Sequence, residues 1–120
     1  MSTPDALLDV ICLCAQWCGN CRAYRDAFGA QAPAWAGRAR LHWLDVEDES
    51  EVVGDLDIDN FPSLLVLRGR EPLFLGPITP QAQVLQQLVQ SALDGRLAPL
   101  PDPEARALAL RIQAHLQPSP

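Results

Sequence analysis

The chain alternates between short apolar runs and longer stretches in which apolar residues recur every three or four positions. Short runs rich in Val, Leu and Ile are typical of buried strands, and the longer spacing is typical of helices with one buried face. We therefore expect an α/β domain. Its strands are expected at residues 7–14, 41–46, 64–67 and 72–75.

The last two expected strands flank the polar segment 68–71, which suits the turn of an antiparallel hairpin. Pro72 opens the second strand of that hairpin. Because proline has no N–H to donate to a neighbouring strand, we expect this strand at an edge of the sheet.

Helical spacing begins after the first strand and predicts a helix over residues 21–35 that Pro33 bends or ends. A shorter helix is expected within 49–54. Another is expected over 80–93, capped by Thr79 and followed by the helix-ending Gly95. The buried face of the first helix is expected to comprise Tyr24, Ala27, Phe28 and Gln31.

The C-terminal part of the chain differs in composition from the rest. Prolines recur from residue 97 on, and residues 104–117 then show an amphipathic helical pattern. We expect two units, a domain over 1–96 and a linker with a helix over 97–120. The helix either packs on its own domain or mediates contact with a partner or a second copy. Its apolar side comprises Ala105, Leu108, Ile112 and Leu116.

Charge and hydropathy restrict the partners. The net charge is −6, and the segment 45–59 is acidic, which argues against nucleic acid or an anionic membrane surface. The apolar runs are much shorter than the roughly 20 residues that span a bilayer. An export signal begins with basic residues, and none precedes Arg22 in this chain. We therefore expect a cytoplasmic protein.

All four cysteines lie within residues 12–21. Structural disulfides are rare in a reducing cytoplasm, which favours a catalytic or metal-binding role. Cys18 and Cys21 are one helical turn apart where the first helix begins, and a helix N-terminus stabilises a thiolate. We therefore expect Cys18 to attack a substrate disulfide and Cys21 to resolve the mixed disulfide. Trp17 would provide a docking surface, and Gly19 would allow close approach of the substrate.

Three motifs in this order resemble the thioredoxin family: Ala15-Gln16-Trp17-Cys18-Gly19-Asn20-Cys21, Phe61-Pro62-Ser63 and Gly76-Pro77-Ile78. The resemblance implies a thioredoxin-like fold, with a mixed sheet of about four strands flanked by helices. It implies reduction of disulfide-containing protein substrates without a bound cofactor, with electrons from an upstream disulfide reductase. It also implies a cis-proline at Pro62 beside the dithiol. The implied substrate-binding residues are Trp17, Gly19, Asn20, Phe61, Pro62 and Gly76.

The chain departs from the family pattern in several places. Cys12 stands at the position of the family's buried acid, and Cys14 at that of an aromatic residue. Asn20 replaces the usual proline between the active-site cysteines, which we expect to change the redox potential. The N-terminal strand and helix that precede residue 7 in full-length members are expected to be missing, whereas the C-terminal helix is additional.

Alternatives to the redox reading start from the same cysteines. Strand alternation places Cys12 and Cys14 on one face, where they are either inert core thiols or accessory thiols in exchange. With Cys18 and Cys21 they would supply four thiolates for zinc or an iron–sulfur cluster, but we expect no metal, because two of them lie in a strand. A non-catalytic thioredoxin-like binding module is the second alternative. No role is assigned to His42 or His115, and Asp55, Asp57 and Asp59 lack the spacing of a calcium loop.

Overall fold

The computed structural model describes residues 8–15, 19–35, 37–53, 62–69, 71–79 and 81–116, with the side chains of residues 20 and 82 left undescribed. The strands in these ranges are β1 (Leu8–Cys14), β2 (Ala39–Asp45), β3 (Ser63–Arg68) and β4 (Glu71–Pro77). The α-helices are α1 (Gly19–Ala30), α2 (Ser50–Val53), α3 (Ala82–Leu93) and α4 (Pro103–Leu116), and a short 3-10 helix covers Ala32–Trp35.

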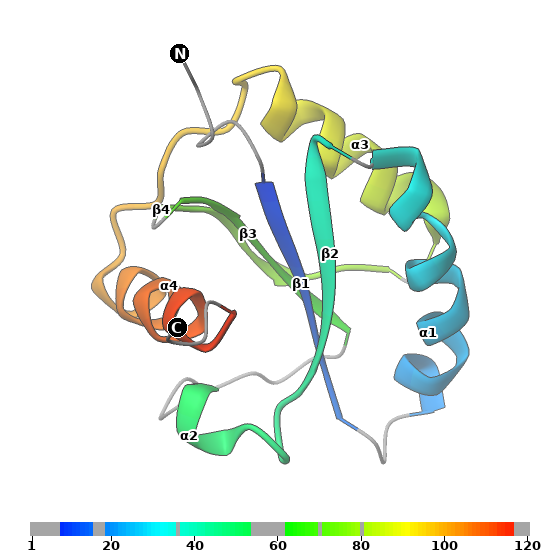
Figure 1. Ribbon diagram of the computed structural model, residues 1–120, viewed down its shortest axis with the longest axis horizontal. Coiled ribbons are helices and arrows are strands. Elements are labelled where there is room, and N and C mark those ends of the chain that lie inside the picture. The colour runs from blue at the N-terminus through cyan, green and yellow to red at the C-terminus, as the bar shows by residue number, and fades with distance from the viewer. Residues whose placement is uncertain are drawn as a thin grey trace.

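The strands form one mixed sheet in the order β2-β1-β3-β4 (Figure 1). β1 runs parallel to β2 and antiparallel to β3, and β3 pairs antiparallel with β4. β1 is therefore an inner strand with a hydrogen-bonded neighbour on each side. β4 lies at an edge, as expected from Pro72. The mixed sheet and its hairpin confirm the fold class predicted from the sequence.

Helices cover both faces of the sheet, with α1 and α3 on one face and α4 on the other (Figure 1). Alternation along β1 divides its side chains between two cores. Val10, Cys12 and Cys14 face the core that includes α1 and α3. Ile11 and Leu13 face the core that includes α4.

The helix α4 is packed on the sheet of its own chain. Leu108, Ala109 and Ile112 are completely buried against that face. The Asp102 carboxylate accepts a hydrogen bond from the N–H of Ala105 at 2.9 Å, which caps the start of the helix. The sequence left open whether this helix packs on its own domain or contacts a partner. In the structure its apolar side packs on its own domain.

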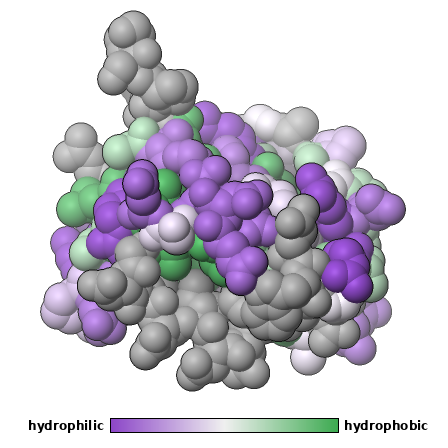
Figure 2. All heavy atoms as spheres, turned by 90° about the horizontal axis from the view of Figure 1, so that it is seen from below, coloured by the Kyte–Doolittle hydropathy of each residue, from purple (hydrophilic) through white to green (hydrophobic). Residues whose placement is uncertain are grey.

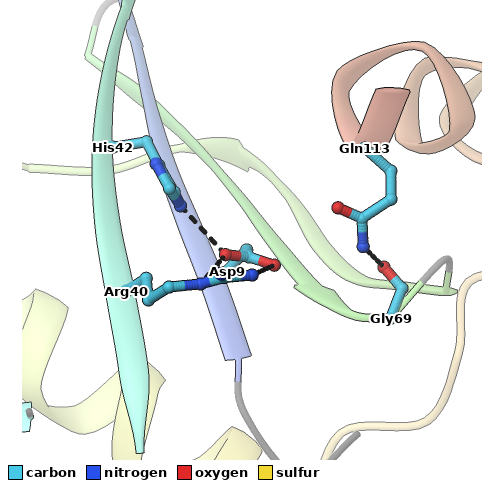
Figure 3. Close-up of polar contacts among 5 residues, drawn as sticks. All are labelled: Asp9, Arg40, His42, Gly69 and Gln113. Carbon is cyan, nitrogen blue, oxygen red and sulfur yellow. Dashed lines mark hydrogen bonds and ion pairs between the residues drawn. The ribbon is translucent and has the colours of Figure 1, made fainter. Parts of the chain in front are cut away.

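Two polar side chains of α4 attach it to neighbouring elements. The Arg111 guanidinium donates to the carbonyl oxygens of Val52 and Val53 in α2, at 2.7 and 2.8 Å. The Gln113 amide donates to the carbonyl oxygen of Gly69 at 2.6 Å (Figure 3). Gly69 forms the β3–β4 turn with a φ of 63°, a left-handed conformation that favours glycine. These contacts join α4 to both α2 and the hairpin.

A buried carboxylate on β1 pairs with the neighbouring strand β2. Asp9 is 1% exposed, and its two oxygens accept hydrogen bonds from the Arg40 guanidinium at 2.9 and 3.0 Å (Figure 3). The His42 Nε2 lies 2.9 Å from the same carboxylate. Burial alone would raise the pKa of Asp9, but the hydrogen bonds and charges of His42 and Arg40 outweigh it and lower the pKa. This network explains why a carboxylate is tolerated within an apolar strand.

Several sequence expectations about element bounds and faces were wrong. The first helix, expected over residues 21–35, spans Gly19–Ala30 and is followed by a separate 3-10 helix. Ala27 is exposed, so the buried face of α1 comprises Cys21, Tyr24 and Phe28. Thr79 does not cap α3: the cap position is Gln81, which makes no side-chain capping bond, and the helix begins at Ala82. β2 begins at Ala39, two residues before the expected start.

No helix within the described ranges combines the length and apolar character needed to cross a membrane.

Candidate active site

The start of α1 lies at the end of the sheet where β1 finishes. α1 begins at Gly19, which is exposed, and Cys21 lies in the first helical turn, where it is 1% exposed within the core. Trp17, Cys18 and Phe61 lie outside the described residues. The structure therefore places only one of the two predicted active-site sulfurs, and places it in the buried position expected of a resolving cysteine.

The other two sequence motifs are brought to the same end of the sheet. Leu13 pairs with Ser63, so the first residue of β3 lies beside the last residues of β1. Pro62 directly precedes β3 and is buried, and its carbonyl oxygen accepts a hydrogen bond from the N–H of Ile78 at 3.0 Å. Gly76 pairs with Leu64 across the hairpin. Motifs more than 40 residues apart in the sequence are thus neighbours.

The helix start provides an electrostatic environment suited to an anion. The first N–H groups of an α-helix have no intrahelical acceptor, and the helix dipole places partial positive charge at this end. The first turn of α1 contains no acidic residue that would oppose a negative charge there. An anionic group immediately before Gly19 would therefore be stabilised.

Cys12 and Cys14 lie beneath α1 on the inner strand. Their Sγ atoms are 3.5 Å apart, and the residues are 0% and 1% exposed. Both face the same core as Cys21, which confirms the alternation expected from the sequence. Among residues in the described ranges, no group of three His, Cys, Asp or Glu side chains is arranged to hold a metal ion. Cys18, the fourth thiol of the metal-binding alternative, lies outside the described ranges.

Tyr24 contributes a polar group that the sequence analysis treated only as part of a helix face. It lies one turn after Cys21, is 2% exposed, and its hydroxyl has no hydrogen-bond partner among the described residues. Burial, together with the charges of Cys12 and Cys14, raises the pKa of Tyr24 to about 12. The spacing of Tyr24 from Cys21 was the sequence signal for this proximity.

The raised pKa of Tyr24 leads to a spectroscopic prediction. Tyr24 is the only tyrosine of the chain, so tyrosinate absorbance reports it alone. Between pH 10 and 11 the folded protein should show much less tyrosinate absorbance than the chain in denaturant, because the unfolded pKa is about 10. The stability that the neutral phenol contributes is present below pH 10 and is lost as the pH rises toward 12. Equal absorbance in folded and denatured samples at pH 10.5 would contradict this environment for Tyr24.

A cleft of about 440 Å³ adjoins this end of α1. Ala15 and Cys21 line it on one side, and it extends past the edge strand β2 to His115 of α4. Figure 2 views the molecule from this end and shows that much of its described surface is hydrophilic. The charged and titratable side chains that line the cleft are Arg22, Arg25, His42, Asp45, Asp48, Glu49 and His115.

Comparison with known proteins identifies the family. The thioredoxin family model matches residues 5–90, which is most of the chain. The chain belongs to the thioredoxin family. Thioredoxin M3, a chloroplastic protein of rice (Oryza sativa subsp. japonica), is 27% identical over 81 residues, which make up 67% of this chain and 46% of the rice protein. This thioredoxin-family chain thus spans about half the length of that relative.

Solved thioredoxin structures share the fold. The germline-specific thioredoxin Deadhead of Drosophila melanogaster matches with a TM-score of 0.64 at 21% identity, covering 72% of this chain and 82% of the fly protein. The thioredoxin of Fasciola hepatica matches with a TM-score of 0.63 at 19% identity, covering 71% and 80%. These matches confirm the thioredoxin-like fold.

Proposed function

We propose that this thioredoxin-family protein reduces disulfides of other proteins, with Cys18 as the attacking sulfur and Cys21 as the resolving sulfur. The observation that carries the proposal is the position of Cys21, buried in the first turn of α1 three residues after Cys18. This spacing supports Cys18 as the attacking sulfur, because a thiolate directly before the helix would benefit from the positive end of the helix dipole.

The proposed reaction consists of two exchanges. The Cys18 thiolate attacks one sulfur of the substrate disulfide and releases the other as a thiolate, forming a mixed disulfide. Cys21, as a thiolate, then attacks the Cys18 sulfur and releases the substrate thiolate. The protein is left with a Cys18–Cys21 disulfide, and a dithiol donor must reduce it before the next cycle. An upstream disulfide reductase is the proposed donor, so the chain itself needs no bound cofactor.

The remaining roles follow from the same proposal. Trp17, Gly19, Asn20, Phe61, Pro62 and Gly76 are the proposed substrate-binding residues. Pro62 and Gly76 lie at the end of the sheet where α1 begins, which supports their inclusion. A cytoplasm is the proposed setting, because the reducing direction requires a compartment that keeps thiols reduced.

The direct test is reduction of insulin disulfides by dithiothreitol in the presence and absence of the full chain. The protein should accelerate the reaction in proportion to its concentration. The pH dependence of iodoacetamide labelling at Cys18 should give a midpoint below about 8.5, the pKa of an ordinary thiol. A non-catalytic binding module would give neither acceleration nor a lowered midpoint, and that pair of results would refute the proposal.

A further inference from the structure

Two thiols of the core are close to each other and shielded from solvent. The Cys12 and Cys14 Sγ atoms lie 3.5 Å apart, and neither residue is more than 1% exposed. The sheet and α1 cover this core, so a dissolved oxidant has no direct access to either sulfur in the folded protein. Any oxidation of this pair must pass through a sulfur that already lies in the same core.

Cys21 is such a sulfur. It belongs to the same buried core as Cys12 and Cys14, and in the proposed function it alternates between a thiol and one half of a disulfide. Cys21 therefore belongs both to the core of the pair on β1 and to the proposed exchange reaction with Cys18.

Tyr24 supplies a second observation at this location. Its hydroxyl is buried without a partner in the described part of the chain, and it interacts electrostatically with both Cys12 and Cys14. Because the phenol stays neutral until about pH 12, it adds no negative charge beside a thiolate formed at either sulfur.

We propose that Cys12 and Cys14 form a second redox-active dithiol inside the core, which is oxidised by the Cys18–Cys21 disulfide through Cys21. This inference rests on the proposed function of Cys18 and Cys21. It gives the protein capacity for two disulfides from its four cysteines, because the Cys12–Cys14 dithiol can donate a second electron pair to the Cys18–Cys21 disulfide once that disulfide has formed.

The transfer comprises two exchanges that conserve atoms and electrons. The Cys14 thiolate attacks the Cys21 sulfur of the Cys18–Cys21 disulfide, which forms a Cys14–Cys21 bond and releases Cys18 as a thiolate. The Cys12 thiolate then attacks the Cys14 sulfur, forming the Cys12–Cys14 disulfide and releasing Cys21. Cys12 and Cys14 are oxidised, Cys18 and Cys21 are reduced, and a substrate disulfide can oxidise the Cys18–Cys21 pair again.

Strand geometry determines the order in which the two pairs are oxidised. Residues two apart on a strand have Cα atoms roughly 6.6 Å apart, which is near the upper limit for a disulfide. A disulfide at this limit is more easily reduced than one at the commonest separation of about 5.5–6 Å. The Cys12–Cys14 pair is therefore oxidised after the Cys18–Cys21 pair and reduced before it.

Exhaustive oxidation of the native chain tests the inference. The reduced protein is incubated with excess glutathione disulfide, and the reaction is stopped by unfolding the protein in acid. Remaining thiols are then alkylated in denaturant and counted by mass spectrometry. We expect an early product with two alkylated cysteines and a final product with none. Chymotryptic cleavage after Leu13 and Trp17 would separate Cys12, Cys14 and the Cys18–Cys21 pair for mapping. Trypsin would leave all four in one peptide, because Arg22 is the first basic residue.

Variants distinguish the proposed route from direct oxidation. In the Cys12→Ala and Cys14→Ala variants, oxidation should end with one cysteine still a thiol and therefore alkylated. In the Cys21→Ser variant, Cys12 and Cys14 should both remain thiols. The inference is overturned if the native chain completes its Cys18–Cys21 disulfide while Cys12 and Cys14 remain thiols. It is equally overturned if Cys21→Ser oxidises the inner pair as fast as the native chain. Failure of the Cys18–Cys21 disulfide to form would instead refute the proposed function. The experiment therefore distinguishes a failure of this inference from a failure of the proposed function.

Discussion

Replacement of Cys18 by serine is expected to lower the rate of insulin reduction to that of dithiothreitol alone. The helix N-terminus can bring the pKa of a thiol into the neutral range, whereas a serine hydroxyl stays protonated and is a poor nucleophile. The first exchange then cannot begin, whatever the state of Cys21. The rate of insulin precipitation, followed by turbidity with equal dithiothreitol in every sample, measures the effect.

Replacement of Cys21 by serine should stop turnover at a different step. Cys18 can still attack the substrate, but nothing within the chain resolves the mixed disulfide, so a covalent complex should accumulate. Non-reducing electrophoresis would show this complex, and dithiothreitol would reduce the mixed disulfide and separate its two parts. Ala27→Ser is a suitable control, because Ala27 is exposed on the same helix and outside the proposed site. Native turnover by Cys18→Ser would contradict the assignment of the attacking sulfur.

The Leu108→Ala variant is expected to lose about 2–5 kcal/mol of unfolding free energy, the range for removing a fully buried leucine side chain. Leu108 is 0% exposed in the core between α4 and the sheet. Domains of this size are typically stable by only about 5–15 kcal/mol, so the loss is a large fraction of the total. Chemical denaturation followed by circular dichroism measures it.

The same helix provides the matched control. Leu110 is 53% exposed, so Leu110→Ala removes the same atoms without opening a cavity and should change the unfolding free energy by less than about 0.5 kcal/mol. Equal and small losses in the two variants would show that α4 contributes little to the stability of the sheet. A large loss in Leu108→Ala alone would show that this helix is an integral part of the folded domain.

Much of the candidate active site could be predicted from local sequence. A buried strand followed directly by Cys18 and Cys21 predicts a dithiol at a helix start, and the structure confirms the strand, the helix and the buried position of Cys21. The convergence of Pro62 and Gly76 on that end followed only from the resemblance to a family. No periodicity in the chain specifies which strands pair.

The features that sequence reasoning missed depend on contacts between distant residues. The hydrogen bonds of Asp9 to Arg40 and His42 span more than 30 residues, so neither the role of His42 nor the early start of β2 could be recognised locally. Ala27 is ambiguous because alanine favours helices on exposed and buried faces alike. At the start of α3, the Gln81 N–H bonds to the Thr79 carbonyl oxygen at 2.8 Å, a turn that delays the helix.

The position of α4 in the chain has a consequence for folding during synthesis. The helix follows every strand of the described sheet in sequence, yet it covers the apolar side chains of Ile11, Leu13 and Leu65. All four strands therefore leave the ribosome before their cover does. A nascent chain that has already paired β1 with β3 exposes one apolar face of the sheet for the few seconds in which residues 78–116 are synthesised, at roughly 5–20 residues per second. During that interval, capture by a chaperone competes with aggregation.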